Sequence, residues 1–400
     1  MVEFFQNLSM SEIPVYGDPV DPGAWRQIQV CKRTAEVACL MADHHQGYAM
    51  PIGGVCAYDG KISPAGVGYD IACGNKAVRL DLPASEIKPR ISTIMDDVWR
   101  ALSFGVGLNN KDGRVDHELF DDDAWTQVAW LRQASLKDIA RNQLGTIGSG
   151  NHYVDVFEDE AGSTWVGVHF GSRGFGHKTA THFLSEAGAS DKIDAEPVLL
   201  DVDSTIGSDY LASMGLAGRY AYAGRDWVCN KVASILGAPI LEEVHNHHNF
   251  AWLEEHDGRK LWVVRKGATP AFPGQRGFVG GSMGDDSVIL EGVESQESAR
   301  ILYSTVHGAG RVMSRTQAAG KMNYKTRTRS GGQVTRDMMD EWTRAKGVEL
   351  RGGGVDESPH CYKRLSDVLA FHAGTVRVLH TLKPLGVCMA GANEFDPYRD

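Results

Sequence analysis

The sequence lacks the features of several common protein classes. It contains no Cys-x-x-Cys pair and its seven cysteines are scattered, so it indicates neither a disulfide framework nor a zinc finger. No apolar run is long enough to span a bilayer, and the N-terminal residues lack the cationic start and apolar core of a secretion signal. There is no internal repeat and no convincing linker. We therefore expect a cytoplasmic protein of one domain, without a membrane anchor.

An excess of positive charge is also missing. The chain has 41 Lys and Arg against 51 Asp and Glu, a formal net charge of −10, which argues against unspecific coating of nucleic acid. One stretch departs from this balance, because residues 311–336 carry several Lys and Arg and no acidic residue. Such a run is either a solvated face or a local track for phosphates.

Glycine, in contrast, is abundant. The 46 glycines form clusters at 145–150, 171–176, 280–284 and 308–310, each with a histidine or serine in or beside it. A tight turn accounts for any one cluster. Four of them together favour loops that approach a ligand or a phosphate group.

The hydrophobic pattern gives a coarse secondary structure after an irregular lead-in over residues 1–32. Apolar or alternating runs predict strands at 36–42, 77–82, 153–157, 164–169, 260–268 and 287–290. Helical spacing of apolar residues predicts helices at 84–104, 122–143, 178–188, 205–236, 337–346 and 365–382.

The stretch 66–74, G-V-G-Y-D-I-A-C-G, is the strongest local pointer to chemistry. It places Asp70 and Cys73 three residues apart between glycines. A carboxylate and a thiolate at this spacing can face one metal ion, and one sulfur can bridge two ions. The local alternative is an ordinary turn followed by a buried thiol. Any further ligands must be histidines.

Four sites supply histidine candidates, each of which alone is more often structural. The tract 243–249, E-V-H-N-H-H-N, holds three histidines, of which we favour His248 as a metal ligand. His169 ends a predicted strand just before Arg173, an arrangement that can bind a metal beside a phosphate. His152 ends a glycine-rich loop, and His307 has small neighbours that leave room for a ligand on the imidazole.

These motifs, in their order along the chain, resemble the RtcB family of RNA ligases. The set is G-V-G-x-D-I-x-C-G, L-G-T-x-G-S-G-N-H, H-x-G-S-R-G-x-G, H-H-N, R-K-G-A-x-x-A, G-S-M-G, H-G-A-G-R-x-M-S-R, C-Y-K and L-K-P-L-G-V, between about residue 36 and about residue 391. The resemblance implies a single α+β domain over 1–400, with mixed β-sheets around a central metal and nucleotide cleft, peripheral helices, and a C-terminal tail at 392–400.

The resemblance also implies cofactors and a nucleophile. Asp70, Cys73, His152, His169 and His248 match the family's site for two Mn²⁺ ions, with the cysteine bridging. The ligand types alone would equally suit Zn, Co or Fe, so manganese comes from the family. His307 matches the histidine that attacks the α-phosphate of GTP to form a covalent GMP–imidazole adduct, and Asp43 matches the aspartate that orients it.

The family further implies an RNA substrate and a nucleotide pocket. GMP would pass to an RNA 3′-phosphate or 2′,3′-cyclic phosphate end, and a 5′-hydroxyl end would displace it, in tRNA halves or damaged RNA, with a possible archease-type activating protein. The matched nucleotide-binding residues are Asn151, Asp155, Asn249, Gly280, Gly281, Ser282, Met283, Ser287, Gly308, Ala309, Gly310 and Tyr362, the last stacking on the base. Arg173, Arg311 and Arg315 would meet RNA or nucleotide phosphates.

The chain departs from the family at positions that concern the base. Asp155 stands where the family usually has a glutamate that reads guanine, and Met389 replaces a near-terminal lysine. Losing two base-reading groups predicts weaker or altered selection for guanine. Two other functions stay open: a two-metal phosphohydrolase that acts on RNA ends without a covalent adduct, and an RNA-end binder without catalysis.

Overall fold

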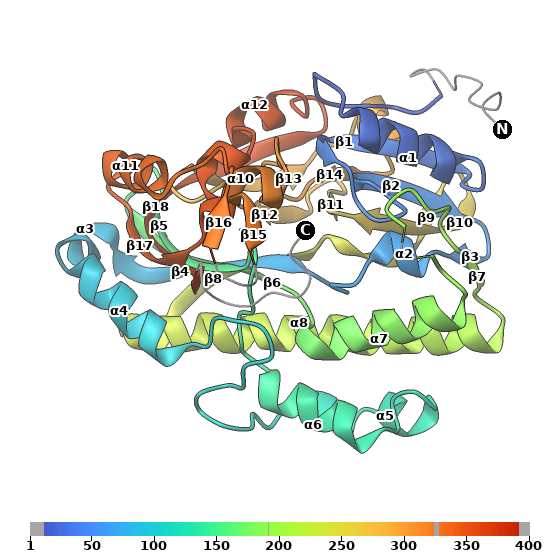
Figure 1. The fold of residues 1–400 in the computed structure, drawn as a ribbon, viewed down its shortest axis with the longest axis horizontal. Coiled ribbons are helices and arrows are strands. Elements are labelled where there is room, and N and C mark those ends of the chain that lie inside the picture. The colour runs from blue at the N-terminus through green and yellow to red at the C-terminus, as the bar shows by residue number, and fades with distance from the viewer. Residues whose placement is uncertain (1–11, 191, 324–327, 392–400) are drawn as a thin grey trace.

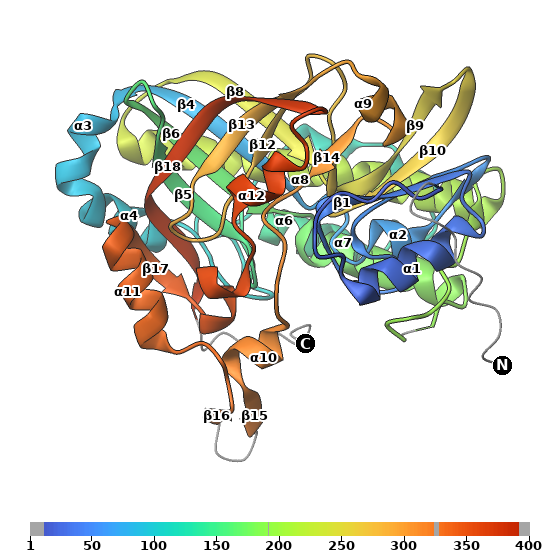
Figure 2. The same ribbon diagram turned by 90° about the horizontal axis from the view of Figure 1, so that it is seen from above.

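The largest element is an eight-stranded mixed sheet that is nearly closed (Figures 1 and 2). This computed structural model describes residues 12–190, 192–323 and 328–391. The strand order is β12-β13-β18-β5-β6-β4-β8, with β17 paired to β18. The strands are β4 (Gly74–Pro83), β5 (Tyr153–Glu158), β6 (Ser163–Phe170), β8 (Ile240–His247), β12 (Arg276–Val279), β13 (Ser287–Gly292), β17 (Glu349–Gly353) and β18 (Val376–Gly391). The two end strands approach each other where the Phe278 amide donates to Asn246 Oδ1 at 3.0 Å.

A second, four-stranded antiparallel sheet stands beside the first, in the order β1-β2-β10-β9. Its strands are β1 (Val37–His45), β2 (Ile52–Tyr58), β9 (Asn249–His256) and β10 (Arg259–Lys266), with the short pair β11 (Ala268–Pro270) and β14 (Ser304–Val306) close by. The remaining short pairs are β3 (Lys61–Ile62) with β7 (Leu200–Asp201), and β15 (Lys321–Asn323) with β16 (Thr328–Ser330), a projecting hairpin (Figure 2).

The chain passes from one sheet to the other at His248. Strand β8 of the large sheet ends at His247 and strand β9 of the small sheet begins at Asn249, so one residue separates the two sheets. The His248 amide donates to Cys73 O at 2.9 Å, and the Ala268 amide donates to His248 O at 3.2 Å. This crossing point therefore ties together the segments from which the site is built.

Helices surround the sheets. They are α1 (Pro22–Lys32), α2 (Pro64–Val67), α3 (Ala84–Ile87), α4 (Ile91–Ala101), α5 (Ala124–Gln127), α6 (Ala134–Gln143), α7 (Arg173–Glu186), α8 (Thr205–Leu236), α9 (Gln296–Arg300), α10 (Arg315–Ala319), α11 (Arg336–Lys346) and α12 (Leu365–Ala370), with short 3₁₀ turns between some of them. In Figure 1, α7 and α8 run along one side beneath the sheets. Within the described ranges, no helix combines the length and apolarity needed to cross a bilayer.

Helix α8, of 32 residues, contributes buried side chains to two of the hydrophobic clusters of the core. The Ser204 hydroxyl caps its start by accepting from the Gly207 amide at 3.1 Å, and Gly237 ends it with a left-handed φ of 72°. Its buried residues pack partly against α7 and partly against β4 and β6. Apolar burial on two sides explains why a helix of 32 residues is stable here.

Most predicted elements are present, and some predictions need correction. Residues 22–32 are not an irregular lead-in but helix α1, which begins with an Asp21 cap and Pro22. The expected helix over 365–382 is wrong: α12 ends at Ala370 and β18 begins at Val376.

The physical cause of the last error lies in residues 371–376. Helical spacing holds for Leu365, Val368 and Leu369, but Gly374 then interrupts it and the β-branched Thr375 and Val376 follow. The predicted helix over 122–143 is likewise divided into α5 and α6. The C-terminal tail at 392–400, and Lys325 and Arg327 of the basic run, lie outside the described residues.

Candidate active site

A cavity of about 580 Å³ lies where the two sheets meet. Of the residues predicted from the sequence, those on its lining are Asp70, Cys73, Asn151, His152, Asp155, His169, His248, Asn249, Gly280, Gly281, Ser282, Met283, His307, Gly308, Ala309, Gly310, Arg311, Arg315 and Tyr362. Asp43, Arg173 and Ser287 lie behind the lining and contact residues on or next to it. The structure thus gathers residues from nearly the whole chain around one cavity.

Three of the predicted metal ligands, Cys73, His152 and His169, form a compact group, which we call the metal-type cluster. The ligand atoms of Cys73, His152 and His169 lie within 4.8 Å of one another, and all three residues are buried. The Cys73 sulfur is 3.6 Å from Nε2 of His152 and 3.6 Å from Nε2 of His169. Soft thiolate and imidazole donors at these distances are suited to a transition-metal ion.

Asp70 and His248 flank this cluster on two sides. Asp70 Oδ2 is 3.0 Å from His152 Nε2. The His248 ring stacks on His169 with ring centroids 5.0 Å apart, and its buried Nδ1 has no hydrogen-bond partner among the described residues. A buried imidazole nitrogen without a partner is costly unless a ligand completes it. All five predicted ligands are therefore adjacent, and their donor types fit a metal.

Two of the five predicted ligands, His169 and His248, are in the neutral form that binds metals. Burial lowers the pKa of His169 and of His248 well below the usual range, and neighbouring histidines lower both further, so both rings are neutral. Asn75 Oδ1 accepts from His169 Nδ1 at 2.6 Å, which leaves Nε2 free to face Cys73. Burial, together with the Asp70 charge, raises the pKa of Cys73 well above its usual range, so a metal ion must displace its proton.

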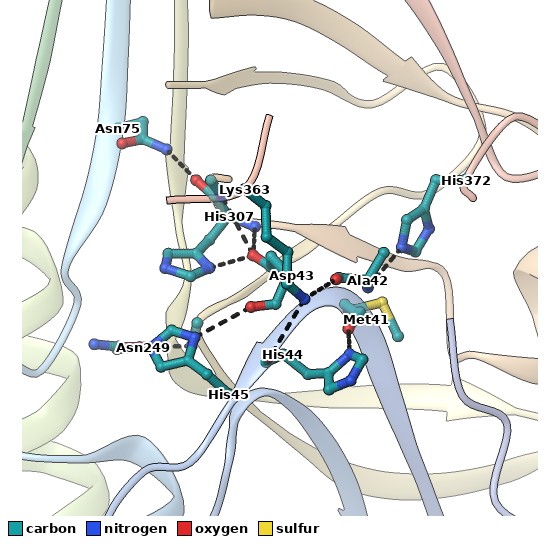
Figure 3. A network of polar contacts seen from close by, with 12 residues as sticks. Met41, Ala42, Asp43, His44, His45, Asn75, Asn249, His307, Lys363 and His372 are labelled. Carbon is teal, nitrogen blue, oxygen red and sulfur yellow. Dashed lines mark hydrogen bonds and ion pairs between the residues drawn. The ribbon is translucent and has the colours of Figure 1, made fainter. Parts of the chain in front are cut away.

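On the other side of the cavity, a buried aspartate orients His307 (Figure 3). Asp43 Oδ2 accepts from His307 Nδ1 at 2.6 Å, from the His307 amide at 3.0 Å and from the Gly308 amide at 3.3 Å. Burial raises the pKa of Asp43, but contact with His307 outweighs burial and holds it below its usual range. Because Nδ1 carries the proton, Nε2 of His307 is left as a free nucleophilic nitrogen.

The strand that carries Asp43 is held firmly (Figure 3). Lys363 Nζ donates to Ala42 O at 2.8 Å and to His44 O at 3.4 Å, on both sides of Asp43. His372 Nε2 accepts from the Ala42 amide at 3.2 Å. The carboxylate therefore sits on a backbone that is fixed independently of any ligand.

Asn75 connects the two sides of the cavity. Its Oδ1 accepts from His169, while its Nδ2 donates to Phe278 O at 2.9 Å and to His307 O at 3.4 Å. The rings of His248 and His307 are 4.8 Å apart between centroids. The metal-type cluster and the oriented histidine thus form one continuous site.

The loop 280–287 forms part of the wall that the sequence assigns to a nucleotide. Ser287 Oγ accepts from the Gly281 amide at 3.0 Å, and Ser282 Oγ donates to Asp285 Oδ2 at 2.8 Å. Asp285 also pairs with Arg364. The acidic residue after G-S-M-G therefore braces the loop from outside the cavity.

Asp155 faces the same cavity in an apolar setting. Its Oδ1 is buried without a hydrogen-bond partner among the described residues, and burial raises the pKa of its carboxyl well above the usual range. Met389 lies on β18, the strand paired with β5. Both residues line the cavity, where a carboxyl with a raised pKa and a methionine stand in place of the glutamate and lysine of the family pattern.

The three predicted phosphate-binding arginines have protein partners in this structure. Arg311 and Arg315 form ion pairs with Glu357, and Arg315 also pairs with Asp356 at 3.3 Å. Arg311 stacks over the Tyr362 ring at 4.9 Å. These contacts place both arginines and the tyrosine in one network at the cavity wall.

Arg173 has a different position. Its Nη1 donates to Ile147 O at 2.7 Å and to His152 Nδ1 at 3.1 Å. It therefore supports the metal-type cluster from behind, and the phosphate contact that the resemblance implies for it stays a prediction.

Sequence reasoning missed several residues of the site. Asn75 could have been predicted as a site residue, because it directly follows the Asp-x-x-Cys-Gly motif. Lys266 lies on the cavity lining, donates to Tyr48 O at 2.6 Å and Ala65 O at 3.0 Å, and has its pKa lowered by burial to about 8. It is the lysine of the R-K-G-A motif, but that motif does not by itself place its side chain at a cavity.

A buried Cys/His cluster beside a histidine that a buried aspartate orients is typical of metal-dependent enzymes that use a histidine as nucleophile or proton carrier. Comparison with known proteins identifies the family. The family model described as tRNA-splicing ligase RtcB matches residues 26–390. This chain belongs to the RtcB family, which supports a role as an RNA ligase.

Individual relatives cover nearly the same span. The tRNA-splicing ligase RtcB of Archaeoglobus fulgidus is 33% identical, over 88% of this chain and 87% of its own length. The RNA-splicing ligase RtcB of Escherichia coli strain K12 is 31% identical, over 88% and 89%. The tRNA-splicing ligase RtcB of Thermococcus kodakarensis is 31% identical, over 93% of both chains.

Proposed function

We propose that this chain is a GTP- and Mn²⁺-dependent RNA ligase that joins 3′-phosphate or 2′,3′-cyclic phosphate ends to 5′-hydroxyl ends, in tRNA splicing or RNA repair. The observation that carries the proposal is the Asp43–His307 pair, whose free Nε2 faces a cavity that also contains the Cys73, His152 and His169 cluster. Family membership supplies the class of reaction.

The metal would be held by Cys73, His152 and His169, with Asp70 and His248 at its sides. This set fits a metal because two imidazoles and a thiol converge, burial keeps His169 and His248 neutral, and His248 Nδ1 lacks a partner among the described residues. When bound, the ions would offset the negative charge on phosphate oxygens during each transfer.

His307 performs the first step. Its Nε2 forms a bond to the α-phosphorus of GTP as the bond to pyrophosphate breaks and pyrophosphate leaves. The Nδ1 proton remains on the ring, donated to Asp43, which offsets the positive charge that develops on the imidazole. Asp43 can do this because its low pKa keeps it ionised.

The remaining steps return His307 to its starting state. An oxygen of the RNA 3′-phosphate attacks the α-phosphorus, the P–N bond breaks, and RNA carrying a 3′-linked GMP is formed. A 5′-hydroxyl oxygen then attacks the 3′-phosphorus, its proton passes to solvent, and GMP leaves. A 2′,3′-cyclic end must first take up water to open to the 3′-phosphate.

The walls of the cavity suit these substrates. Loop 280–287 and the Gly308–Gly310 turn offer backbone close to the cavity, and Tyr362 offers an aromatic ring. Arg311 and Arg315 line the cavity and can bind phosphate groups. To do so, the substrate phosphates must displace Asp356 and Glu357 from their ion pairs with these arginines.

A joining assay tests the proposal. Purified protein is incubated with GTP, Mn²⁺ and two RNA oligonucleotides, one ending in a 3′-phosphate and the other beginning with a 5′-hydroxyl. We expect a joined product from the wild-type chain and none from His307→Ala. Opening of a 2′,3′-cyclic end by both proteins, without joining, would instead favour the phosphohydrolase. RNA binding without turnover would favour a binding protein.

A further inference from the structure

A fully buried arginine stands directly behind the metal-type cluster. Arg225, on α8, has an exposed fraction of 0%. Its Nη1 donates to Ala72 O at 3.0 Å and to Phe170 O at 2.6 Å, and its Nη2 donates to His247 Nδ1 at 3.0 Å. Its Nε donates to His245 Nε2 at 2.8 Å. Among the described residues, no carboxylate forms an ion pair with it.

Three of these acceptors are each adjacent in sequence to a predicted metal ligand. Ala72 directly precedes Cys73, Phe170 directly follows His169, and His247 directly precedes His248. The three pairs come from three separate segments, the 70–73 turn, the end of β6 and the end of β8. One guanidinium group therefore binds the flanks of ligands that lie up to 175 residues apart in the chain (248 − 73).

The sheet geometry explains how one side chain reaches all three segments. Gly74, the first residue of β4, pairs with Phe170 of β6 on one side and with His247 of β8 on the other. A β-carbon at Gly74 would clash with Asn246 O and lie 3.1 Å from Arg225 Nη2, so the absence of a side chain lets β8 pack closely and also leaves room for the guanidinium. Arg225 thus lies across the ends of three neighbouring strands.

The turn before Cys73 needs this support. Ala72 has a φ of 58°, a left-handed conformation that is unfavourable for a residue with a β-carbon. Its carbonyl is held by Arg225, and its amide donates to Asn249 O at 2.7 Å. Both peptide groups next to the strained residue are therefore fixed by distant parts of the chain.

Arg265 provides a contrast within the same molecule. It is also fully buried, but it pairs with both carboxylate oxygens of Glu254, at 2.6 and 3.1 Å, and donates to Ser304 Oγ and Leu302 O. Its charge is neutralised in the small sheet. Arg225 has no such partner among the described residues, and its hydrogen bonds are directed to the segments that bear the ligands.

We propose that Arg225 is a positioning residue of the metal centre, which sets the relative positions of Cys73, His169 and His248 through the residues next to them. This inference rests on the proposed function, because it concerns the metal that the ligase would use. The planar fork of a guanidinium donates to all four acceptors in fixed directions, which the single ammonium group of lysine does not.

The experiment compares Arg225→Lys with Arg265→Lys, using Co²⁺ as the probe. Binding of Co²⁺ to a thiolate gives a charge-transfer absorption band, and competition with a chelating dye gives the affinity. The melting temperature of each metal-free protein reports the structural cost. We expect Arg225→Lys to weaken Co²⁺ binding by about 10–100-fold and to alter the band. Arg265→Lys should lower the melting temperature while leaving affinity and band unchanged.

An unchanged affinity and spectrum in folded Arg225→Lys would overturn the proposal. If that variant does not fold, His245→Phe gives a milder test, because it removes the acceptor of the Arg225 Nε–H group and a 3.5 Å contact with Asp226 but leaves the other three Arg225 hydrogen bonds in place. We then expect a weakening of about 3–10-fold, and wild-type affinity would overturn the proposal. A wild-type chain that binds no Co²⁺ through Cys73, shown by comparison with Cys73→Ser, would overturn the metal centre as well.

Discussion

The two sides of the cavity are held in different ways. On the small-sheet side, His307 is complete as it stands, because Asp43 Oδ2 accepts three hydrogen bonds from His307 and Gly308. On the large-sheet side, the Cys73 thiol is protonated, and His248 Nδ1 has no partner among the described residues. The proposed nucleophile is therefore oriented by protein groups alone, whereas the proposed metal ligands are supported from behind and have ligand atoms that the protein does not satisfy.

This difference follows from what each side must do. A nucleophilic histidine needs one tautomer and one orientation throughout the reaction, which a buried carboxylate supplies. A metal centre must accept ions and release protons, so its ligand atoms cannot be satisfied in advance by the protein. Substitutions on the two sides should therefore affect different measurements.

The largest effect that separates the two sides is expected for Asp43→Asn. The amide keeps the shape of the carboxylate but lacks its charge and disfavours the reactive tautomer of His307, so adduct formation should slow by about 10³–10⁴-fold. Co²⁺ affinity should stay at the wild-type value, because Asp43 contacts none of the cluster residues. The measurement is the rate of nucleotide labelling beside a metal titration, and an equal loss in both would contradict the separation.

Cys73→Ser is expected to act on metal binding directly, and on labelling only through the loss of the metal. Replacing the thiol by a hydroxyl removes the softest ligand, and metal affinity should fall by about 100-fold or more. Chelation of the wild-type chain should likewise stop labelling. In both cases the circular dichroism spectrum should be unchanged, because β4, β6 and β8 pair through backbone hydrogen bonds that need no ion. Unfolding upon chelation would show that the metal side is structural.

Substitution of Asn75 should affect metal affinity and labelling together, because its side chain contacts both His169 and His307. Asn75→Ala removes the acceptor for His169 Nδ1 and the donor to His307 O, so metal affinity and labelling should each fall by about tenfold. Asn75→Asp is the matched control, since it keeps the acceptor and loses the donor. It should retain metal affinity and lose only labelling rate; equal losses in both variants would exclude this division of roles.

The smallest effect concerns Asp155, which contacts neither side. Burial raises the pKa of the Asp155 carboxyl in the folded state above its ordinary value in the unfolded state. Between the unfolded-state and the folded-state pKa, only the folded state keeps the proton, so the free energy of unfolding falls as the pH rises through this range. Asp155→Asn removes this loss and should be the more stable protein at neutral pH. The difference in the free energy of unfolding should grow by up to about 1.4 kcal/mol per pH unit. Urea unfolding from pH 4 upward measures it, and a constant difference would contradict a buried neutral carboxyl.

The ligand-bearing segments could be predicted from the sequence because their motifs are local. Asp70 and Cys73 lie within one turn, and His169 ends a strand that its composition reveals. The choice of His248 among three histidines is consistent with strand geometry. Side chains alternate along β8, so His245 and His247 face Arg225, while Asn246 contacts Phe278 and His248 reaches the cavity.

The supporting residues could not be predicted in the same way. Arg225 matters because β6, β4 and β8 are neighbours in the sheet, which no local pattern reveals. The pairing of Arg311 and Arg315 with Asp356 and Glu357 depends on a contact over about 40 residues of chain. The helix expected at 365–382 failed because periodicity over six residues was extended past Gly374 into a strand.

The most direct test of the account is nucleotide labelling. Purified protein is incubated with Mn²⁺ and each of the four α-³²P-labelled nucleoside triphosphates, then separated by denaturing electrophoresis, with His307→Ala and Cys73→Ala alongside. We predict an acid-labile label that depends on His307 and on metal, with weaker discrimination between GTP and the other nucleotides than in a relative with glutamate at position 155. No label from any nucleotide, with folded and metal-loaded protein, would contradict a nucleotidyl-histidine enzyme.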